Sequence, residues 1–215
     1  MAHVFGSDSV GFGNLSGWSI IGNDSDDAFK RGEAFGPTGN EVASNLYDET
    51  ITVSTRYQAS STDTPTIPAT LGADINSITV TGISVSTSAD GFVEMTLTGH
   101  RHVSPGTHGT VRTVAHGITL ARAFGVSPFG VTVTETNGLY SSTANIETQH
   151  QDVPGTLGHT IAGENYDGKI TIEVTATGTL TATLSGYDCT SVKTPQSNTD
   201  FKRQSATFIK ALAMA

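Results

Sequence analysis

Two stretches of the chain carry the same residues at a constant spacing of 119 positions. Tyr47-Asp48 reappears as Tyr166-Asp167, and Ile51-Thr52 reappears as Ile170-Thr171. Ten identities lie between residues 5 and 55 without a gap, where a random pairing would give roughly three at ordinary residue frequencies. Several of them are glycines, so the same backbone turns are expected to recur. The pattern predicts two copies of one module.

The later part of each copy matches at a shorter spacing. Ser84-Val85-x-Thr87 resembles Ser191-Val192-x-Thr194, and Phe92 matches Phe201. We therefore predict three segments along the chain. They are a first β module at residues 1–99, a His-rich loop and crossover at 100–120, and a second β module at 121–215.

Apolar and polar residues alternate with period two in several short stretches, as in a half-buried strand. In residues 49–58, Ile51, Val53, Thr55 and Tyr57 fall on one face. Val93, Met95 and Leu97 are likewise expected to face the core of the first module. The same alternation occurs at residues 131–135, 169–177 and 77–86, the last with a bulge predicted at Gly82.

These patterns predict an all-β chain made of two tandem related β-sandwich/barrel modules, with at most one or two short helices. The helix candidates are residues 24–31 and 208–215. The first has acidic residues early and Lys30-Arg31 late, the order that the helix dipole favours.

Composition narrows the class of partner. The net charge is −9 and only 14% of residues are charged, whereas gripping a phosphate backbone requires clustered Lys and Arg. We expect no specific nucleic-acid binding. No signal peptide is visible at the N-terminus and no run of 18 apolar residues occurs, so we expect no membrane partner. The single cysteine, Cys189, is expected to be a small buried residue of a strand.

The densest group of potential metal ligands is His100, His102, His108 and His116. His100 and His102 are two apart, so on a strand both rings would project from one face, with His108 able to complete a three-His site. The alternative is a polar, Gly-rich loop in which His is a surface residue. No metal-site framework supports a ligand set, and the prediction is that no residue binds a metal.

Other constellations also favour structural roles. Asp24, Asp26 and Asp27 resemble half a calcium loop, but they lack its Gly and Glu and suit a helix N-terminus better. Each Tyr-Asp pair is interpreted as a turn before a strand. Neither a G-x-S-x-G elbow nor a phosphate-binding Gly loop is present. We therefore predict a non-enzyme without catalytic residues or cofactors.

Short blocks of the sequence resemble uncharacterised structural proteins of tailed bacteriophages. They are residues 39–45 (GNEVASN), 163–167 (GENYD), 196–201 (QSNTDF) and 99–102 (GHRH). The resemblance implies a virion component. Two β-rich modules in one chain are similar in plan to tail-tube proteins with a duplicated tube domain. In that family three subunits form a ring with pseudo-sixfold symmetry around an acidic lumen, and there are no catalytic residues.

The expected function is therefore a structural protein of a phage virion, foremost a tail-tube subunit that assembles into rings or tubes. Its expected partners are copies of itself, in a trimeric ring, and other virion proteins. Its expected location is the virion, after synthesis in the host cytoplasm. The alternatives are a head decoration or neck protein, or a cell-surface or carbohydrate-binding β-sandwich.

Overall fold

The computed structural model describes residues 11–59, 70–88, 91–102, 128–135, 138–154, 160–194 and 202–212. Within these ranges every regular element except one 3₁₀ turn is a strand, so the prediction of an all-β fold is confirmed. The elements are β1 (Trp18–Phe35), β2 (Glu41–Ala59), β3 (Asp74–Ile75), β4 (Ile78–Ser88), β5 (Glu94–His102), η1 (Pro128–Gly130), β6 (Thr132–Glu135), β7 (Leu139–Pro154), β8 (Thr160–Thr177), β9 (Leu180–Thr183), β10 (Asp188–Lys193) and β11 (Arg203–Ala211). In this part of the chain no helix is long and apolar enough to cross a membrane.

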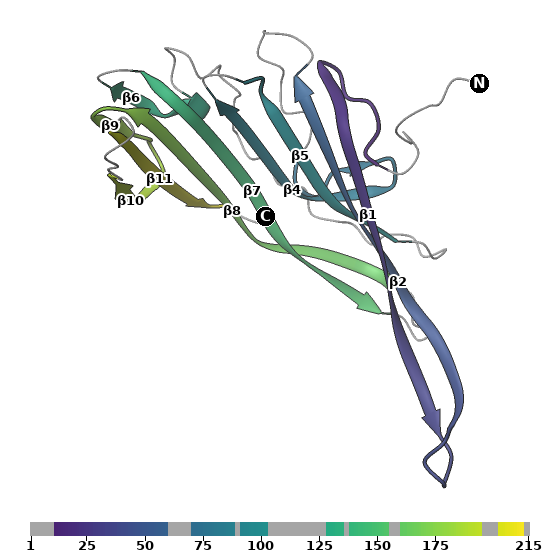
Figure 1. Ribbon diagram of the computed structural model, residues 1–215. Coiled ribbons are helices and arrows are strands. Elements are labelled where there is room, and N and C mark those ends of the chain that lie inside the picture. The colour runs from purple at the N-terminus through teal and green to yellow at the C-terminus, as the bar shows by residue number, and fades with distance from the viewer. Residues whose placement is uncertain are drawn as a thin grey trace, which may run out of the picture.

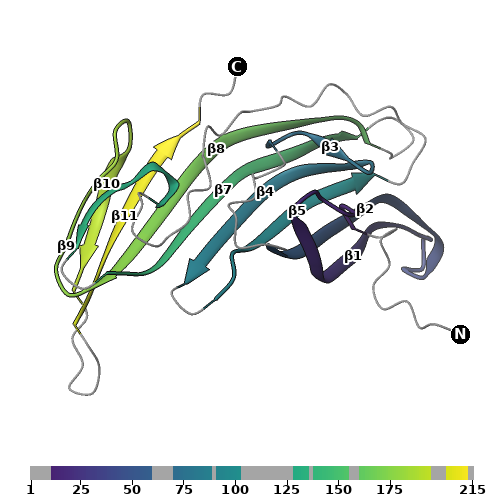
Figure 2. The ribbon, with the colours of Figure 1, turned by 90° about the horizontal axis from the view of Figure 1, so that it is seen from above.

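One large antiparallel sheet contains strands from both halves of the chain. Its order is β1-β2-β5-β4-β7-β8-β11-β10, with β3 paired to β4, while β6 and β9 form a separate two-stranded sheet. Figure 1 shows these strands side by side, and Figure 2 shows the same sheet from above. Direct pairing of β4 with β7 joins the two predicted modules into a single sheet.

The hairpins β1–β2 and β7–β8 have the same register. Every partner pair along β7–β8 is obtained by moving a pair of β1–β2 forward by 119 residues. Ile51 and Ile170, for example, occupy the same position, opposite Asp27 and Ile146. The register shifts coincide as well: those after Ile20, Ala28 and Ala34 match those after Leu139, Glu147 and Val153.

The remaining strands correspond at a spacing of 109 residues. Each pair of β10–β11 equals a pair of β4–β5 moved forward by that amount, including the shift between Val80 and Gly82. The bulge predicted at Gly82 is therefore confirmed. In the structure the counterpart of Ser191 is Gly82. The sequence match of Ser84 with Ser191 was therefore out of register by two residues. Thr-rich strands resemble one another at any even shift, because the side-chain period is two.

One face of the sheet is apolar and buried. Val53, Thr55 and Tyr57 are buried on β2, as are Met95 and Leu97 on β5, which confirms their predicted phase. Val93 is partly buried against the same core. Residues from outside the main sheet complete this core: Phe12, Leu71, Phe129, Val131 and Leu180.

Both helix predictions were wrong within the described residues. Residues 24–31 lie inside β1, and residues 208–211 lie inside β11. β11 pairs with β8 on one side and β10 on the other, while β1 pairs with β2 along nearly its whole length. Cross-strand pairing of this extent outweighs a weak local preference for helix.

Candidate assembly interface

The two outermost strands of the large sheet are β1 and β10. Across the ranges that the structure describes, β1 pairs only with β2, and β10 only with β11. Backbone groups along the outer side of such a strand are a template for pairing with another chain. By register, β1 corresponds to β7, and β10 corresponds to β4. The two edge strands are therefore the counterparts of the two strands that pair with each other in the middle of the sheet.

The β4–β7 pairing shows what these edges look like when they are covered. Ile83 of β4 lies opposite Ile146 of β7, and the two side chains are 2% and 1% exposed. Val192, the counterpart of Ile83 on β10, is 62% exposed. Ala144 of β7 is fully buried, and its counterpart on β1, Ser25, is exposed. Each edge therefore leaves open a position that the internal pairing buries.

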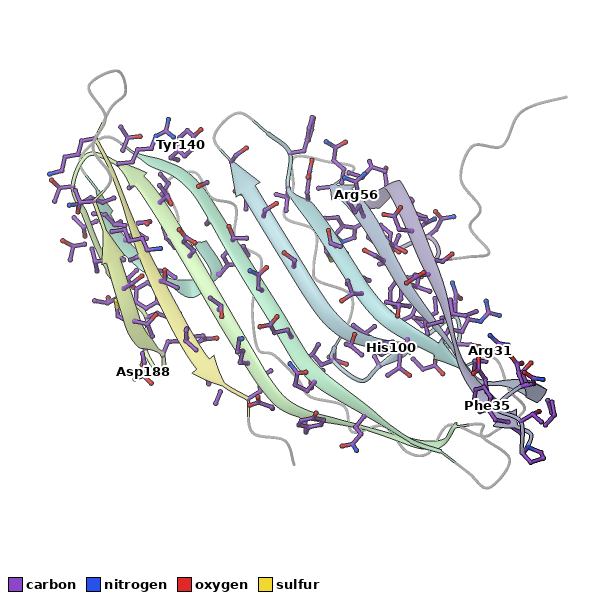
Figure 3. The ribbon with its side chains drawn as sticks, turned by 60° about the horizontal axis from the view of Figure 1, so that its bottom comes forward. Arg31, Phe35, Arg56, His100, Tyr140 and Asp188 are labelled. Carbon is purple, nitrogen blue, oxygen red and sulfur yellow. The ribbon has the colours of Figure 1, made fainter. Side chains whose placement is uncertain are left out.

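The other face of the sheet is polar and carries mainly Thr, Ser and charged side chains. Arg56 of β2 and His100 of β5 are among them (Figure 3). At the β4–β7 pairing, Ser84 Oγ donates a hydrogen bond of 2.6 Å to Asn145 Oδ1 across the strands. A shallow depression lies beside this pair, because Gly82 contributes no side chain there. Hydroxyl groups of Ser84, Thr96 and Thr98 line this depression together with the side chain of Glu147.

Both long hairpins continue beyond the sheet on the same side (Figure 1). We call residues 29–49 the first arm and residues 148–154 with 160–168 the second arm, because each begins where pairing with β5 or β11 has ended. In the first arm, Arg31 holds both carboxylate oxygens of Glu41 at 2.7 and 2.9 Å. Phe35 is 62% exposed and Val42 is 67% exposed near its end. Figure 3 shows Arg31 and Phe35 away from the side chains of the sheet. The first arm thus presents apolar side chains to whatever lies beyond it.

The repeated Tyr-Asp pairs lie at the base of the arms, inside β2 and β8, and not in turns before strands. Each falls at a bulge in which one residue of the partner strand faces two. In the second arm Asp167 has φ 51°, and Thr148 Oγ1 donates a hydrogen bond of 2.8 Å to the Tyr166 carbonyl. The prediction of a turn before each strand was therefore wrong, because each pair marks a bulge within a continuous strand.

The residues considered for metal binding are not assembled into a site by the described structure. His100 lies on β5 between Thr52 and Thr79, and His102 ends the same strand. His108 and His116 lie outside the described residues. In the residues described, no group of three or more His, Cys, Asp or Glu is placed to hold a metal ion.

The acidic group of Asp24 and Asp26 belongs to strand β1, and not to the start of a helix. These residues pair with Ser54 and Thr52, which places them on the polar face. The prediction for Cys189 was correct in strand but wrong in burial, since it is exposed on β10. Its counterpart Val80 is fully buried.

Sequence reasoning missed the edge residues of β1 and β10 as a functional surface. The 109-residue spacing, seen in the match of Phe92 with Phe201, was the signal that could have found them. Applied to β4, it aligns the buried Ile83 with Val192 and marks Val192 as a core-type residue at an edge.

Comparison with known proteins does not assign the chain to a group. No protein-family model matches it, and no curated protein matches it.

Proposed function

We propose that the protein is a structural subunit of a phage virion that assembles with copies of itself into a ring, as a tail-tube subunit does. The observation that carries the proposal is the shared register of the two halves within one sheet. Two copies of a module placed side by side, with matching open edges at both ends, can be continued by a further copy. Such head-to-tail contacts give a ring when the rotation closes.

The internal arrangement is consistent with this symmetry. If the halves are copies of one module, a ring of three chains contains six nearly equivalent modules. Each contact between chains then resembles the contact between β4 and β7 inside a chain. Ring closure also pairs the two edges, which covers the outer backbone groups of β10 and of the part of β1 that faces it.

In such a ring the polar face lines the channel. The apolar face is already covered by residues outside the main sheet, including Phe12 and Phe129, whereas the Thr- and Ser-rich face is open. A wall of small hydroxyl groups, in an acidic chain of net charge −9, offers few sites at which a nucleic acid would be held. This supports a conduit and not a binding protein.

The arms supply contacts along the axis of a stack. They project from one side of the sheet, roughly along its strands (Figure 1). The exposed Phe35 and Val42 give the first arm an apolar surface to bury against a neighbouring ring. Phe35→Ser is expected to weaken stacking while leaving single rings intact, with Thr38→Ser in the same arm as the matched control.

Electron microscopy and light scattering of the purified chain test the proposal. Rings or tubes of uniform diameter are expected, with the protein found in the tail of virions. Particles that stay monomeric at high concentration and are absent from virions would overturn it. A location on the capsid surface or at the neck would replace the tail-tube role by a head decoration or neck role.

A carbohydrate-binding sandwich is less well supported. Such modules present aromatic platforms to sugars, and the one tryptophan of the chain, Trp18, is only 5% exposed. The exposed aromatic residues Phe35, Phe92 and Tyr166 lie on separate segments, so we propose no sugar site.

A further inference from the structure

The structure supplies a template for the contact between neighbouring chains. β4 pairs with β7 in a defined register, with Ser84 opposite Asn145 and Ile83 opposite Ile146. The counterparts of these strands are the two open edges, β10 and β1. Adding 109 to a residue number of β4 gives its counterpart on β10, and subtracting 119 from a residue number of β7 gives its counterpart on β1. These two spacings carry the register of β4–β7 over to the two edges.

We propose that β10 of one copy pairs antiparallel with β1 of the next copy, with Lys193 opposite Asp26. This inference rests on the proposed ring and names its interface. In the same register Val192 lies opposite Asp27 and Ser191 opposite Ala28. The occupant of each edge is therefore a second copy of this chain.

The charges on the two strands agree with this register. Lys193 pairs with Ser205 and Asp26 pairs with Thr52, and both partners lie on the polar face. Lys193 and Asp26 thus meet on one face of the extended sheet. They take the positions of Ser84 and Asn145, whose side chains share the 2.6 Å hydrogen bond. A neutral hydrogen-bonded pair inside the chain is replaced by an ion pair between chains.

The exposure of residues on β10 also favours pairing with a second copy. Val192 and Cys189 face the apolar side, as Ile83 and Val80 do, yet only the latter two are buried. An added strand, with the residues that cover it, would remove Val192 from water as β7 does for Ile83. A copy of β1, with 18 residues, is long enough to cover the six residues of β10, and it carries the acidic side chain that Lys193 requires.

Charge reversal tests the register. Lys193→Asp and Asp26→Lys should each raise the protein concentration needed for assembly roughly tenfold, since like charges then face each other. The double variant should restore assembly. Glu173→Lys, on the polar face of the central strand β8, is the matched control and should leave assembly unchanged. No recovery in the double variant would overturn the proposed register.

Cysteine pairing separates this inference from the proposed function. In a Cys189→Ser background, Lys193→Cys with Asp26→Cys should form a disulfide between copies under mild oxidation. Lys193→Cys with Ser25→Cys, which points to the opposite face, should not. Intact rings without the first crosslink would overturn the register and leave the ring standing. A protein that stays monomeric at every concentration would overturn both.

Discussion

The ring of Phe12 occupies the space above Gly99: its Cζ atom lies 2.8 Å from the position that a Cβ atom on Gly99 would take. The corresponding positions in the second half are Val131 and Phe208, both buried. The large side chain therefore comes from the segment before β1 in one half and from the sheet in the other.

Gly99→Ala is expected to destabilise the fold by about 1–3 kcal/mol, the usual cost of overpacking a core. The added methyl group would also meet the Thr79 carbonyl oxygen and Ile78, so movement of Phe12 alone cannot relieve it. Denaturant unfolding measures the effect. Thr52→Ala on the exposed polar face of β2 is the control and should change stability by less than about 0.5 kcal/mol. Equal stability of the two variants would contradict the packing.

Leu97→Ala is expected to cost about 2–5 kcal/mol, because Leu97 is fully buried. The neighbouring Thr96 points to the polar face, so Thr96→Ala serves as a control with a much smaller effect. Thermal melts of both variants check the prediction. A melting temperature unchanged by Leu97→Ala would mean that the two faces of β5 are assigned the wrong way round.

Stability is expected to fall at alkaline pH through Tyr57. Burial raises the pKa of Tyr57 to about 12 from its ordinary value of 10.0, against a smaller lowering by a hydrogen bond with Thr55. Its hydroxyl donates a 2.8 Å hydrogen bond to the Gly13 carbonyl. Since the folded pKa is the higher one, this stabilisation is complete below pH 10 and is lost as the pH rises towards 12.

Tyr57→Phe provides the comparison for that titration. At pH 7 it should cost about 1 kcal/mol, since the Gly13 carbonyl loses its hydrogen-bond donor. Between pH 10 and 12 its stability should decline less than that of the wild-type chain, as measured by urea unfolding at each pH. Parallel pH profiles for the two proteins would exclude Tyr57 as a source of the alkaline loss.

The histidines around β5 are expected not to form a metal centre. Metal analysis of the native protein should find no stoichiometric zinc or iron, and the double variant His100→Ala with His102→Ala should fold with an unchanged strand signal in circular dichroism. One tightly bound metal ion per chain, lost in the double variant, would contradict this prediction.

Local pattern alone settled several features of this protein. Alternation with period two gave the strands and the buried phase of Tyr57 and Leu97, because a pleated strand sends successive side chains to opposite faces. The 119-residue spacing picked out positions that share a hairpin register, such as Ile51 and Ile170, since the identities there run without a gap. Gly82 marked a bulge, because a glycine interrupts an otherwise regular alternation.

Tertiary pairing decided the rest. The acidic-to-basic order of residues 24–31 favours a helix locally, but pairing with β2 makes this segment a strand. The joining of both halves into one sheet depends on β4 meeting β7, a contact between distant segments that no local pattern encodes. The same contact explains why Ile83 is buried while its counterpart Val192 is exposed. Burial at an edge depends on the neighbouring strand, which for β10 lies outside this single chain.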